Sequence, residues 1–257
     1  MATRKEIASR VLGLIDLTNL NDDCTPPAID ALCAQAQTPF GNTAAICIWP
    51  RFVAQARKIL GEGNPVRIAT VVNFPSGEEA EKKVLHETKD AIAAGADEID
   101  LVIPYKALIS GDEEAARSMV ATIRAATDGV ALLKVIVESG ELKLPTLIEA
   151  ASRIALEEGA DFIKTSTGKV TVNATPETAG IMLTVLKDFG DPQRGFKPAG
   201  GIRTVDEAGQ YLVLADQILG KDWVSAKTFR FGASSLLGDV LATLGDGKPS
   251  PEAGTDY

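Results

Sequence analysis

The stretch ALLKVIV, residues 131–137, is apolar along its whole length apart from Lys134. A strand with one solvated face alternates between apolar and polar residues. A strand that is covered on both faces, as in a parallel sheet, instead has a continuous apolar run. Residues 145–157 follow with apolar side chains at the spacing of an amphipathic helix. A buried strand and a helix therefore form one predicted unit of this chain.

The same unit recurs along the sequence. Seven further apolar runs of strand length lie at residues 12–17, 44–49, 66–72, 98–103, 161–165, 194–198 and 229–233. From Leu12 to Phe229 the runs are spaced by about 31 residues on average, which is the length of one strand and one helix. Eight such units predict an α/β fold, a single (β/α)8 TIM barrel. A doubly wound open sheet is the alternative, but the even spacing favours closure.

The two ends of the chain lie outside this repeat. Residues 1–11 predict an additional N-terminal helix that caps the barrel, and the predicted barrel domain spans residues 1–245. Residues 246–257 are rich in Pro, Gly and polar residues, a composition that predicts a mobile C-terminal tail. No linker and no second domain are predicted.

Several helix ends can be predicted from local signals. The segment from Thr204 to Glu207 has the pattern of a capping box, in which the Thr hydroxyl and the Glu carboxylate each accept a backbone N–H of the other. Gly95 and Gly159 follow two predicted helices, at positions that favour a left-handed residue. Further helices are expected at residues 78–94, 176–186 and 236–244.

Composition excludes several classes of protein. The chain of 257 residues has 26 basic and 35 acidic side chains, a net charge of −9, whereas nucleic-acid binders usually carry a basic surface. The three cysteines, Cys24, Cys33 and Cys47, have no C-x-x-C spacing, which fits a reducing compartment. No signal peptide is visible, and no apolar run reaches the roughly 18 residues of a membrane span. These features predict a cytoplasmic protein that binds neither nucleic acid nor membrane.

The single histidine restricts the chemistry. His86 lies in a charged segment at residues 82–89, and this charge indicates the solvent-exposed face of a helix. Catalytic zinc usually has two or three histidine ligands, and a Ser-His-Asp triad would need His86 itself. We therefore expect no metal and no such triad, and catalysis that depends on lysine, carboxylate, cysteine or tyrosine.

We single out five charges inside strand runs, where apolar residues are expected: Asp16, Asp100, Lys134, Lys164 and Lys197. Burial of an unpaired charge is costly, so the five are expected to form one cluster at the C-terminal ends of the strands, where barrel active sites lie. A structural ion-pair network is the alternative. Two neighbouring buried lysines disfavour each other's charge, so one can be a neutral amine that attacks a carbonyl. Asp100 would keep the second lysine charged or relay protons.

Three glycine-containing loops follow the sixth, seventh and eighth predicted strands, at residues 166–169, 199–203 and 232–235. Glycine lets backbone N–H groups approach an anion closely, and a helix N-terminus adds a favourable dipole. Barrels often bind phosphate after strands seven and eight. The loops therefore predict a phosphate site. Cys47, within the second strand, is interpreted as a small core residue rather than a reactive thiol.

These motifs together resemble one family. The segments 161–169, 195–203, 231–236 and 42–47, with Asp16 to Thr18, residues 73–75 and residues 97–100, are similar to 2-deoxy-D-ribose-5-phosphate aldolases from about Leu14 to Leu237, and again at Tyr257. The resemblance implies a class I aldolase without a cofactor. Such an enzyme reversibly cleaves 2-deoxyribose 5-phosphate to acetaldehyde and glyceraldehyde 3-phosphate. It also implies a homodimer.

The resemblance assigns roles to individual residues. Lys164 is similar to the Schiff-base lysine, Lys197 to the lysine that helps to keep it neutral, and Asp100 to the proton-relay carboxylate. Tyr257 matches a C-terminal tyrosine that assists proton transfer. The residues expected to bind substrate or support the cluster are Asp16, Thr18, Lys134, Thr167, Gly168, Lys169, Gly200, Gly201, Gly232, Ser234 and Ser235.

Two other functions remain open at this point. A related Schiff-base barrel could act on another phosphosugar, in which case a substrate panel would separate the two. A non-catalytic sugar-phosphate-binding protein would bind ligand without forming a covalent adduct.

Overall fold

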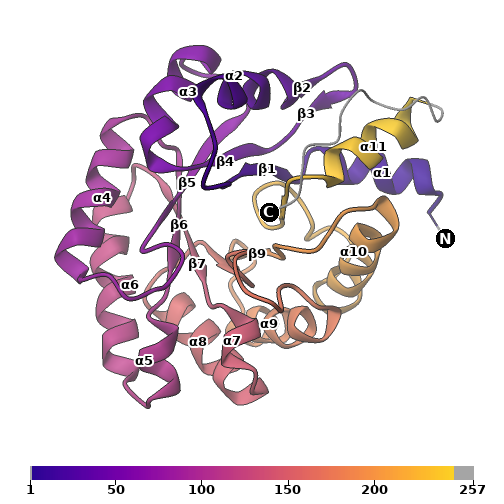
Figure 1. The fold of residues 1–257 in the computed structure, drawn as a ribbon. Helices are drawn as coiled ribbons and strands as arrows, with labels where there is room; N and C mark the ends of the chain where they lie inside the picture. Colours follow the sequence, from indigo (N-terminus) through magenta and orange to yellow (C-terminus); the bar gives the residue numbers. More distant parts are fainter. Residues whose placement is uncertain (1, 246–257) are drawn as a thin grey trace.

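Eight parallel strands form one sheet in the order β10-β1-β4-β5-β6-β7-β8-β9. The computed structural model describes residues 2–245, and Figure 1 shows the strands surrounded by an outer ring of helices. The strands are β1 (Ile15–Asn19), β4 (Ala45–Ile48), β5 (Arg67–Val72), β6 (Glu98–Val102), β7 (Leu132–Ile136), β8 (Phe162–Lys164), β9 (Gly195–Lys197) and β10 (Phe231–Ala233). Parallel bridges from Phe196 to Phe229 and from Ala199 to Gly232 join the two ends of the sheet. The predicted (β/α)8 barrel is confirmed, and the open-sheet alternative is wrong.

The helices of the outer ring alternate with the strands. They are α1 (Arg4–Leu12), α2 (Pro26–Gln35), α3 (Val53–Leu60), α4 (Glu81–Ala93), α6 (Glu113–Thr127), α8 (Pro145–Glu157), α9 (Pro176–Phe189), α10 (Val205–Leu219) and α11 (Leu236–Leu244). Short elements lie in the connections: the 3₁₀ helix η1 (Pro50–Phe52), α5 (Tyr105–Ile109), α7 (Ser139–Leu142) and the hairpin β2 (Gln37–Thr38) and β3 (Gly41–Asn42). The predicted N-terminal helix is present as α1, which packs against α10 and α11.

Most predicted helix boundaries agree with the structure. Helix α8 has the predicted limits, and the capping box at Thr204 is present, with the Thr204 hydroxyl accepting the Glu207 N–H and the Glu207 carboxylate accepting the Thr204 N–H. Gly95 and Gly159 both have positive φ angles, as expected. Helix α4 begins three residues later than predicted. The preceding residues form a turn, in which the Asn73 side chain accepts the Glu79 N–H.

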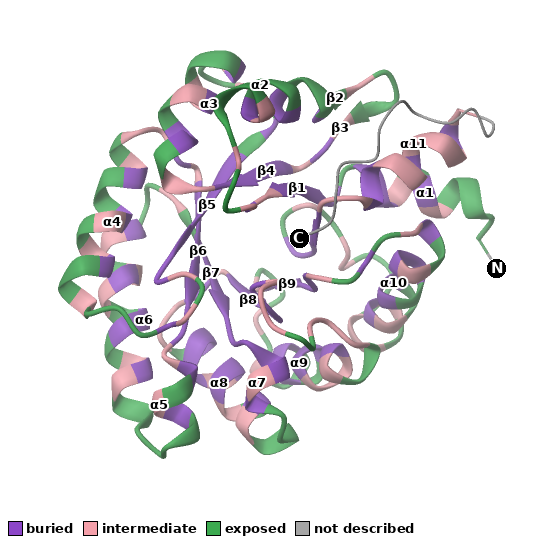
Figure 2. Cartoon of the chain, viewed as in Figure 1, coloured by how far each residue is buried: buried purple, intermediate pink, exposed green. Residues whose placement is uncertain are grey.

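The buried apolar side chains form two separate clusters. Figure 2 shows that the strands and the inward faces of the helices are buried, whereas the outward helix faces are exposed. The main apolar core lies between the sheet and the helices. A separate small cluster of Leu20, Ala45, Cys47, Ala69 and Val71 lies on the other face of the strands, in the barrel interior. The interior therefore has little aliphatic filling, and charged side chains and Phe162 take much of its remaining space.

Small residues make room for long side chains in this interior. A Cβ atom at Gly195 would lie 2.4 to 2.6 Å from ring atoms of Phe162. A Cβ atom at Gly232 would lie 3.1 Å from Cε of Lys197 and 2.8 Å from Cβ of Ala199. Glycine at these two positions thus lets strands β9 and β10 approach the neighbouring interior side chains.

We expect Gly195→Ala to lower the free energy of unfolding by about 1–3 kcal/mol, because overpacking of a full interior costs that much. Thermal unfolding should detect a lower Tm, by about 2–4 °C per kcal/mol for a chain of this size. Gly238→Ala is the matched control, since among residues 2–245 no atom outside the neighbouring backbone of α11 lies within 4 Å of a Cβ at this position and alanine is the better helix former. Equal Tm values for the two variants would contradict the packing argument.

Among residues 2–245, no helix is both long enough and apolar enough to cross a membrane. The predicted C-terminal tail, residues 246–257, lies outside the described residues.

Candidate active site

The strand register brings the predicted lysines and carboxylates together. Lys164 and Lys197 are Cα partners at the ends of β8 and β9, and Asp100 and Lys134 are Cα partners on β6 and β7. Partnered positions of parallel strands point to the same face of the sheet. Asp16 on β1 points into the same interior, since its carboxylate contacts Lys197. All five side chains are at most 3% exposed.

Asp100 is the centre of the cluster. Its Oδ2 atom accepts hydrogen bonds from Nζ of Lys164 and from Nζ of Lys197, both at 2.8 Å. Its Oδ1 atom accepts a third hydrogen bond, from Nζ of Lys134 at 3.0 Å. Nζ of Lys197 also lies 2.6 Å from Oδ2 of Asp16. The predicted common cluster of charges is confirmed.

Thr18 completes the upper part of β1. The Thr18 hydroxyl donates a hydrogen bond to the backbone oxygen of Asp16 at 2.8 Å, and Thr18 is 6% exposed. It is adjacent to the cluster, on the same strand and two residues nearer to the C-terminal end of the barrel, where side chains at i and i+2 share a face.

Charge interactions fix the ionisation of most of these groups. Burial acts to raise the pKa of Asp100, but Lys134, Lys164 and Lys197 outweigh it and hold this pKa well below its usual value. Burial acts to lower the pKa of Lys197, but Asp100 and Asp16 raise it well above its usual value. Burial likewise opposes the charge of Lys134, yet Asp100 and Glu98 raise its pKa. Asp100 is therefore an anion at neutral pH, and Lys134 and Lys197 are cations.

Lys164 differs from the other two lysines in its partners. Among the described residues, Nζ of Lys164 contacts one carboxylate, Asp100, and shares its oxygen with Lys197. Lys197 contacts two carboxylates. A lysine with fewer anionic neighbours and a cation beside it gives up its proton most readily. Lys164 thus has the fewest ion-pair partners of the three lysines among the described residues.

The three predicted phosphate loops lie side by side at the C-terminal ends of β8, β9 and β10. The Gly200 N–H donates to the backbone oxygen of Gly232, and the Ala199 N–H donates to the hydroxyl of Thr165. Gly168, Gly200 and Gly201 have φ angles of 86°, 84° and 80°. A residue with a side chain rarely adopts this conformation, so glycine shapes these loops.

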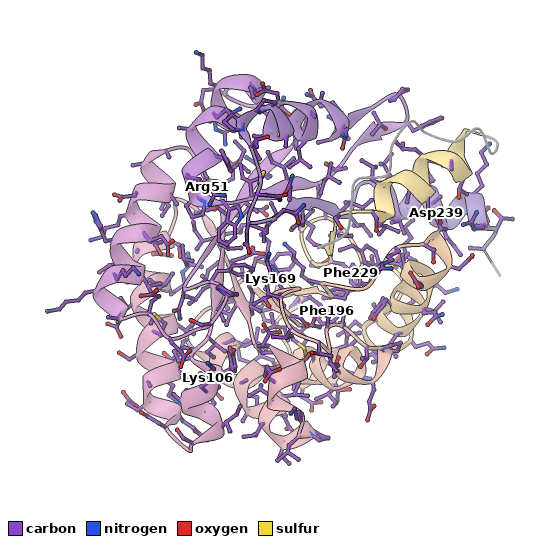
Figure 3. The ribbon with its side chains drawn as sticks, viewed as in Figure 1. Arg51, Lys106, Lys169, Phe196, Phe229 and Asp239 are labelled. Carbon is purple, nitrogen blue, oxygen red and sulfur yellow. The ribbon has the colours of Figure 1, made fainter. Side chains whose placement is uncertain are left out.

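Polar groups surround the loops. Lys169 lies near the middle of the view in Figure 3, unlike Lys106 on the outer ring, and its Nζ contacts Asp22 at 3.5 Å. Ser235 immediately precedes α11, and its hydroxyl makes no capping hydrogen bond to that helix. Ser234 stands beside it, after β10. A helix N-terminus, serine hydroxyls, glycine N–H groups and an ammonium are the groups that bind phosphate.

Comparison with family models identifies the chain. The model of the DeoC/LacD family aldolases matches residues 10–238. The chain belongs to this family of aldolases.

Individual aldolases support this conclusion. A curated deoxyribose-phosphate aldolase from Agrobacterium fabrum is 57% identical over 249 residues, which are 97% of this chain and 96% of that protein. A crystal structure from Toxoplasma gondii, provisionally described as a deoxyribose-phosphate aldolase, has a TM-score of 0.87 at 25% identity and covers 95% of this chain and 97% of its own. A deoxyribose phosphate aldolase from Aeropyrum pernix, described as tetrameric, has a TM-score of 0.74 at 27% identity and covers 94% and 92%.

Two interior charges of this aldolase were not singled out from the sequence. Glu98 on β6 accepts a hydrogen bond from Nζ of Lys134 at 2.5 Å. Arg230, just before β10, donates to Glu98 at 2.9 Å and to Asp16 at 2.7 Å. Glu98 stands two residues before Asp100, so strand alternation alone places both on one face. That signal was present in the sequence. Arg230 lies between two phenylalanines and could be recognised only as a charge in an apolar run.

Glu138 is a third group that sequence reasoning missed. It follows β7 with φ 55°, is fully buried, and accepts hydrogen bonds from both the N–H and the hydroxyl of Thr167. Burial raises the pKa of Glu138, although these hydrogen bonds oppose the shift. Glu138 thereby positions the loop that contains Gly168 and Lys169. No sequence pattern connects a residue after β7 with a loop after β8, so only the fold reveals this contact.

The remaining sequence interpretations have different outcomes. His86 is on the surface as predicted, with 79% of its side chain exposed. Cys47 is a fully buried residue of a small hydrophobic cluster, in agreement with the prediction of a small core residue. It lies in the interior cluster, and burial raises the pKa of its thiol. Tyr257 lies outside the described residues.

Proposed function

We propose that this aldolase reversibly cleaves 2-deoxyribose 5-phosphate to acetaldehyde and glyceraldehyde 3-phosphate through a Schiff base on Lys164. The observation that carries the proposal is the pair of buried lysines on neighbouring strands, whose Nζ atoms both lie 2.8 Å from Oδ2 of Asp100. A buried lysine beside another cation loses its proton more readily, and its neutral amine can then attack a carbonyl carbon. The described activity of the Agrobacterium relative supports the choice of substrate.

The first stage forms the covalent intermediate. The neutral amine of Lys164 attacks the aldehyde carbon of the open-chain substrate, and the resulting carbinolamine loses water to give an iminium. The oxygen that leaves as water takes up a proton. Lys197 stands beside Lys164 on the same oxygen of Asp100, so it is the nearest acid to that oxygen. We assign Lys197, Asp100 and bound water to this proton transfer.

The second stage breaks the C2–C3 bond of the sugar. The C3 hydroxyl loses its proton, the bonding electrons move into the iminium, and glyceraldehyde 3-phosphate leaves an enamine on Lys164. Protonation of the enamine carbon and hydrolysis of the new iminium release acetaldehyde and regenerate the amine. The cationic neighbours Lys134 and Lys197 disfavour the iminium charge, while Asp100 offsets it at 2.8 Å.

The phosphate of the substrate is assigned to the loops after β8, β9 and β10. Gly168, Lys169, Gly200, Gly201, Ser234 and Ser235 supply the N–H groups, hydroxyls and ammonium for this contact. Gly232 makes room for these loops rather than binding the phosphate, because a side chain at this position would collide with Lys197 and Ala199.

We expect Ser235→Asp to raise KM for 2-deoxyribose 5-phosphate on the order of 10²-fold, because a carboxylate facing a phosphate costs several kcal/mol. KM for unphosphorylated 2-deoxyribose should change little, and steady-state kinetics on both sugars measure the difference. Ser235→Ala is the control that removes the hydroxyl without adding charge. Equal losses on the two sugars would refute the phosphate assignment.

A product assay tests the substrate directly. The purified enzyme is incubated with 2-deoxyribose 5-phosphate and with a panel of other phosphosugars, and the aldehydes are quantified. Acetaldehyde and glyceraldehyde 3-phosphate in equal amounts from the first sugar are expected. Preferred cleavage of another phosphosugar would support the related Schiff-base enzyme instead. Binding without cleavage of any sugar would support the sugar-phosphate-binding protein.

We also propose a homodimer in the cytoplasm, as the sequence analysis predicted. The Aeropyrum relative is described as tetrameric, so a tetramer is the alternative. Sedimentation of the purified chain distinguishes a dimer from a tetramer.

A further inference from the structure

We propose that Arg230 and Glu98 are positioning residues that set the protonation of Lys164 through the charge balance of the barrel interior. The inference rests on the proposed role of Lys164 as the nucleophile. Both residues lie toward the N-terminal ends of the strands, where they line a cavity of about 1080 Å³. They therefore act from the end of the barrel opposite to the predicted phosphate loops, without contact with the substrate.

The contacts connect this end of the barrel to the reacting lysine. Arg230 bridges two carboxylates, with Nη1 at 2.7 Å from Asp16 and Nη2 at 2.9 Å from Glu98. Nζ of Lys134 donates a hydrogen bond to the Glu98 carboxylate at 2.5 Å and a second one to Oδ1 of Asp100 at 3.0 Å. Each of these linked side chains is at most 5% exposed, so solvent screens their charges little.

The number of charges in this network is unbalanced. The contacts join three carboxylates and four basic groups: Asp16, Glu98, Asp100, Lys134, Lys164, Lys197 and Arg230. With every group ionised, the buried network has one positive charge in excess. An uncompensated buried charge is costly. Loss of a single proton from a lysine makes the network neutral.

The contacts also determine which lysine loses the proton. Arg230 cannot be deprotonated in a protein. Lys134 contacts Glu98 and Asp100, and Lys197 contacts Asp16 and Asp100. Lys164 contacts Asp100 alone among the described residues. The permanent charge of Arg230 thus occupies carboxylates that would otherwise stabilise a third lysine cation, and Lys164 is left as the neutral amine.

Two other titratable groups face Lys164 and lie outside the ion-paired network. Cys47 on β4 stays a neutral thiol, because burial raises its pKa. The carboxylate of Glu138, which follows β7, accepts hydrogen bonds from the N–H and the hydroxyl of Thr167. It forms no ion pair with a lysine among the described residues. Glu138 also interacts electrostatically with Lys164. Because Glu138 is present in every variant, it moves all midpoints in the same direction and leaves the differences between them unchanged.

The balance predicts opposite effects for the two residues. Arg230→Gln removes one cation, so three carboxylates can hold all three lysines charged, and Lys164 becomes an amine only at higher pH. Glu98→Gln removes one carboxylate, so Lys164 becomes an amine at lower pH. The double variant removes one charge of each sign and should return to the behaviour of the wild-type enzyme.

The test measures the pH profile of Schiff-base formation. Each protein is treated with acetaldehyde and cyanoborohydride from about pH 5 to pH 10, and the initial rate of adduct formation on Lys164 is followed by mass spectrometry. We expect the midpoint to move by about one pH unit toward alkali in Arg230→Gln and toward acid in Glu98→Gln, the size expected for one charge roughly 10 Å away in a protein. The double variant should lie close to the wild-type midpoint.

Two controls separate this role from a structural one. Arg230→Lys keeps the charge and should keep the wild-type midpoint. Arg194→Gln removes an arginine from the same cavity that pairs with Asp161 and Asp191 outside the network, and it should also leave the midpoint unchanged. A merely structural role of Arg230 would lower the rate by the same factor at every pH.

The outcomes distinguish this inference from the proposed function. If the wild-type enzyme forms no adduct on Lys164, the Schiff-base assignment is overturned. If it does, but the midpoints of Arg230→Gln, Glu98→Gln and the wild type coincide, only the charge-balance inference is overturned. Should Arg230→Gln fail to fold because Asp16 and Glu98 lose their partner, an unshifted midpoint in Glu98→Gln would still refute the inference.

Discussion

Replacement of Lys164 with methionine will lower kcat/KM for 2-deoxyribose 5-phosphate by at least about 10⁴-fold, the scale of loss when a covalent nucleophile is removed. Methionine fills much of the same space and has no amine, so neither the carbinolamine nor the iminium can form. The fold should survive, because Lys164 is the lysine with the fewest carboxylate partners in the interior. Initial rates of acetaldehyde release measure the effect.

A matched lysine makes this result specific. Lys106→Met removes a lysine from the outer ring of the molecule, where its ammonium pairs with Glu78. This variant should retain wild-type kcat/KM and Tm. Activity of Lys164→Met within a few-fold of the wild type, in folded protein, would show that Lys164 is not the nucleophile.

The second large effect is expected for Lys197→Leu, which should lower kcat/KM by about 10²–10⁴-fold, the range of a lost general acid. Lys197 is the cation beside Lys164, and it neutralises both Asp16 and Asp100. Without it, the remaining carboxylates hold Lys164 as an ammonium, and no acid stands next to the carbinolamine oxygen. Kinetics at neutral pH and at higher pH should show partial recovery as Lys164 loses its proton.

Stability measurements keep this prediction testable. Removal of one member of a buried ion pair often costs about 3–5 kcal/mol, so unfolding of Lys197→Leu must be measured beside its kinetics. An activity loss that merely matches the unfolded fraction would argue for a structural role of Lys197. A large loss in a protein that is fully folded would support the role in catalysis.

The repeat of the sequence predicted the barrel because each strand is covered on both faces. A continuous apolar run followed by a helical period identifies such a strand without any tertiary information, as in residues 131–137 and α8. Helix starts could be predicted where a side chain marks them, as Thr204 does for α10. The start of α4 was missed because Ala80 provides no capping side chain, and the turn before it depends on Asn73.

The site was predictable where a charge interrupts an apolar run. Lys164, Lys197 and Asp100 stand out for this reason, and the register then brings them onto one carboxylate. Glu98 begins its run two residues before Asp100, and Arg230 lies between Phe229 and Phe231, but neither residue was singled out from the sequence. The orientation of Cys47 could not be deduced, since both faces of its strand are buried and hydrophobicity does not distinguish them.

Reductive trapping with acetaldehyde tests the central claim most directly. The wild-type enzyme is incubated with acetaldehyde and borohydride, digested, and mapped by peptide mass spectrometry. We expect one ethyl group on Lys164 and none on the neighbouring lysines. An ethyl group on Lys134 or Lys197 instead would overturn the assignment of the nucleophile, and folded protein without any adduct would contradict the Schiff-base mechanism.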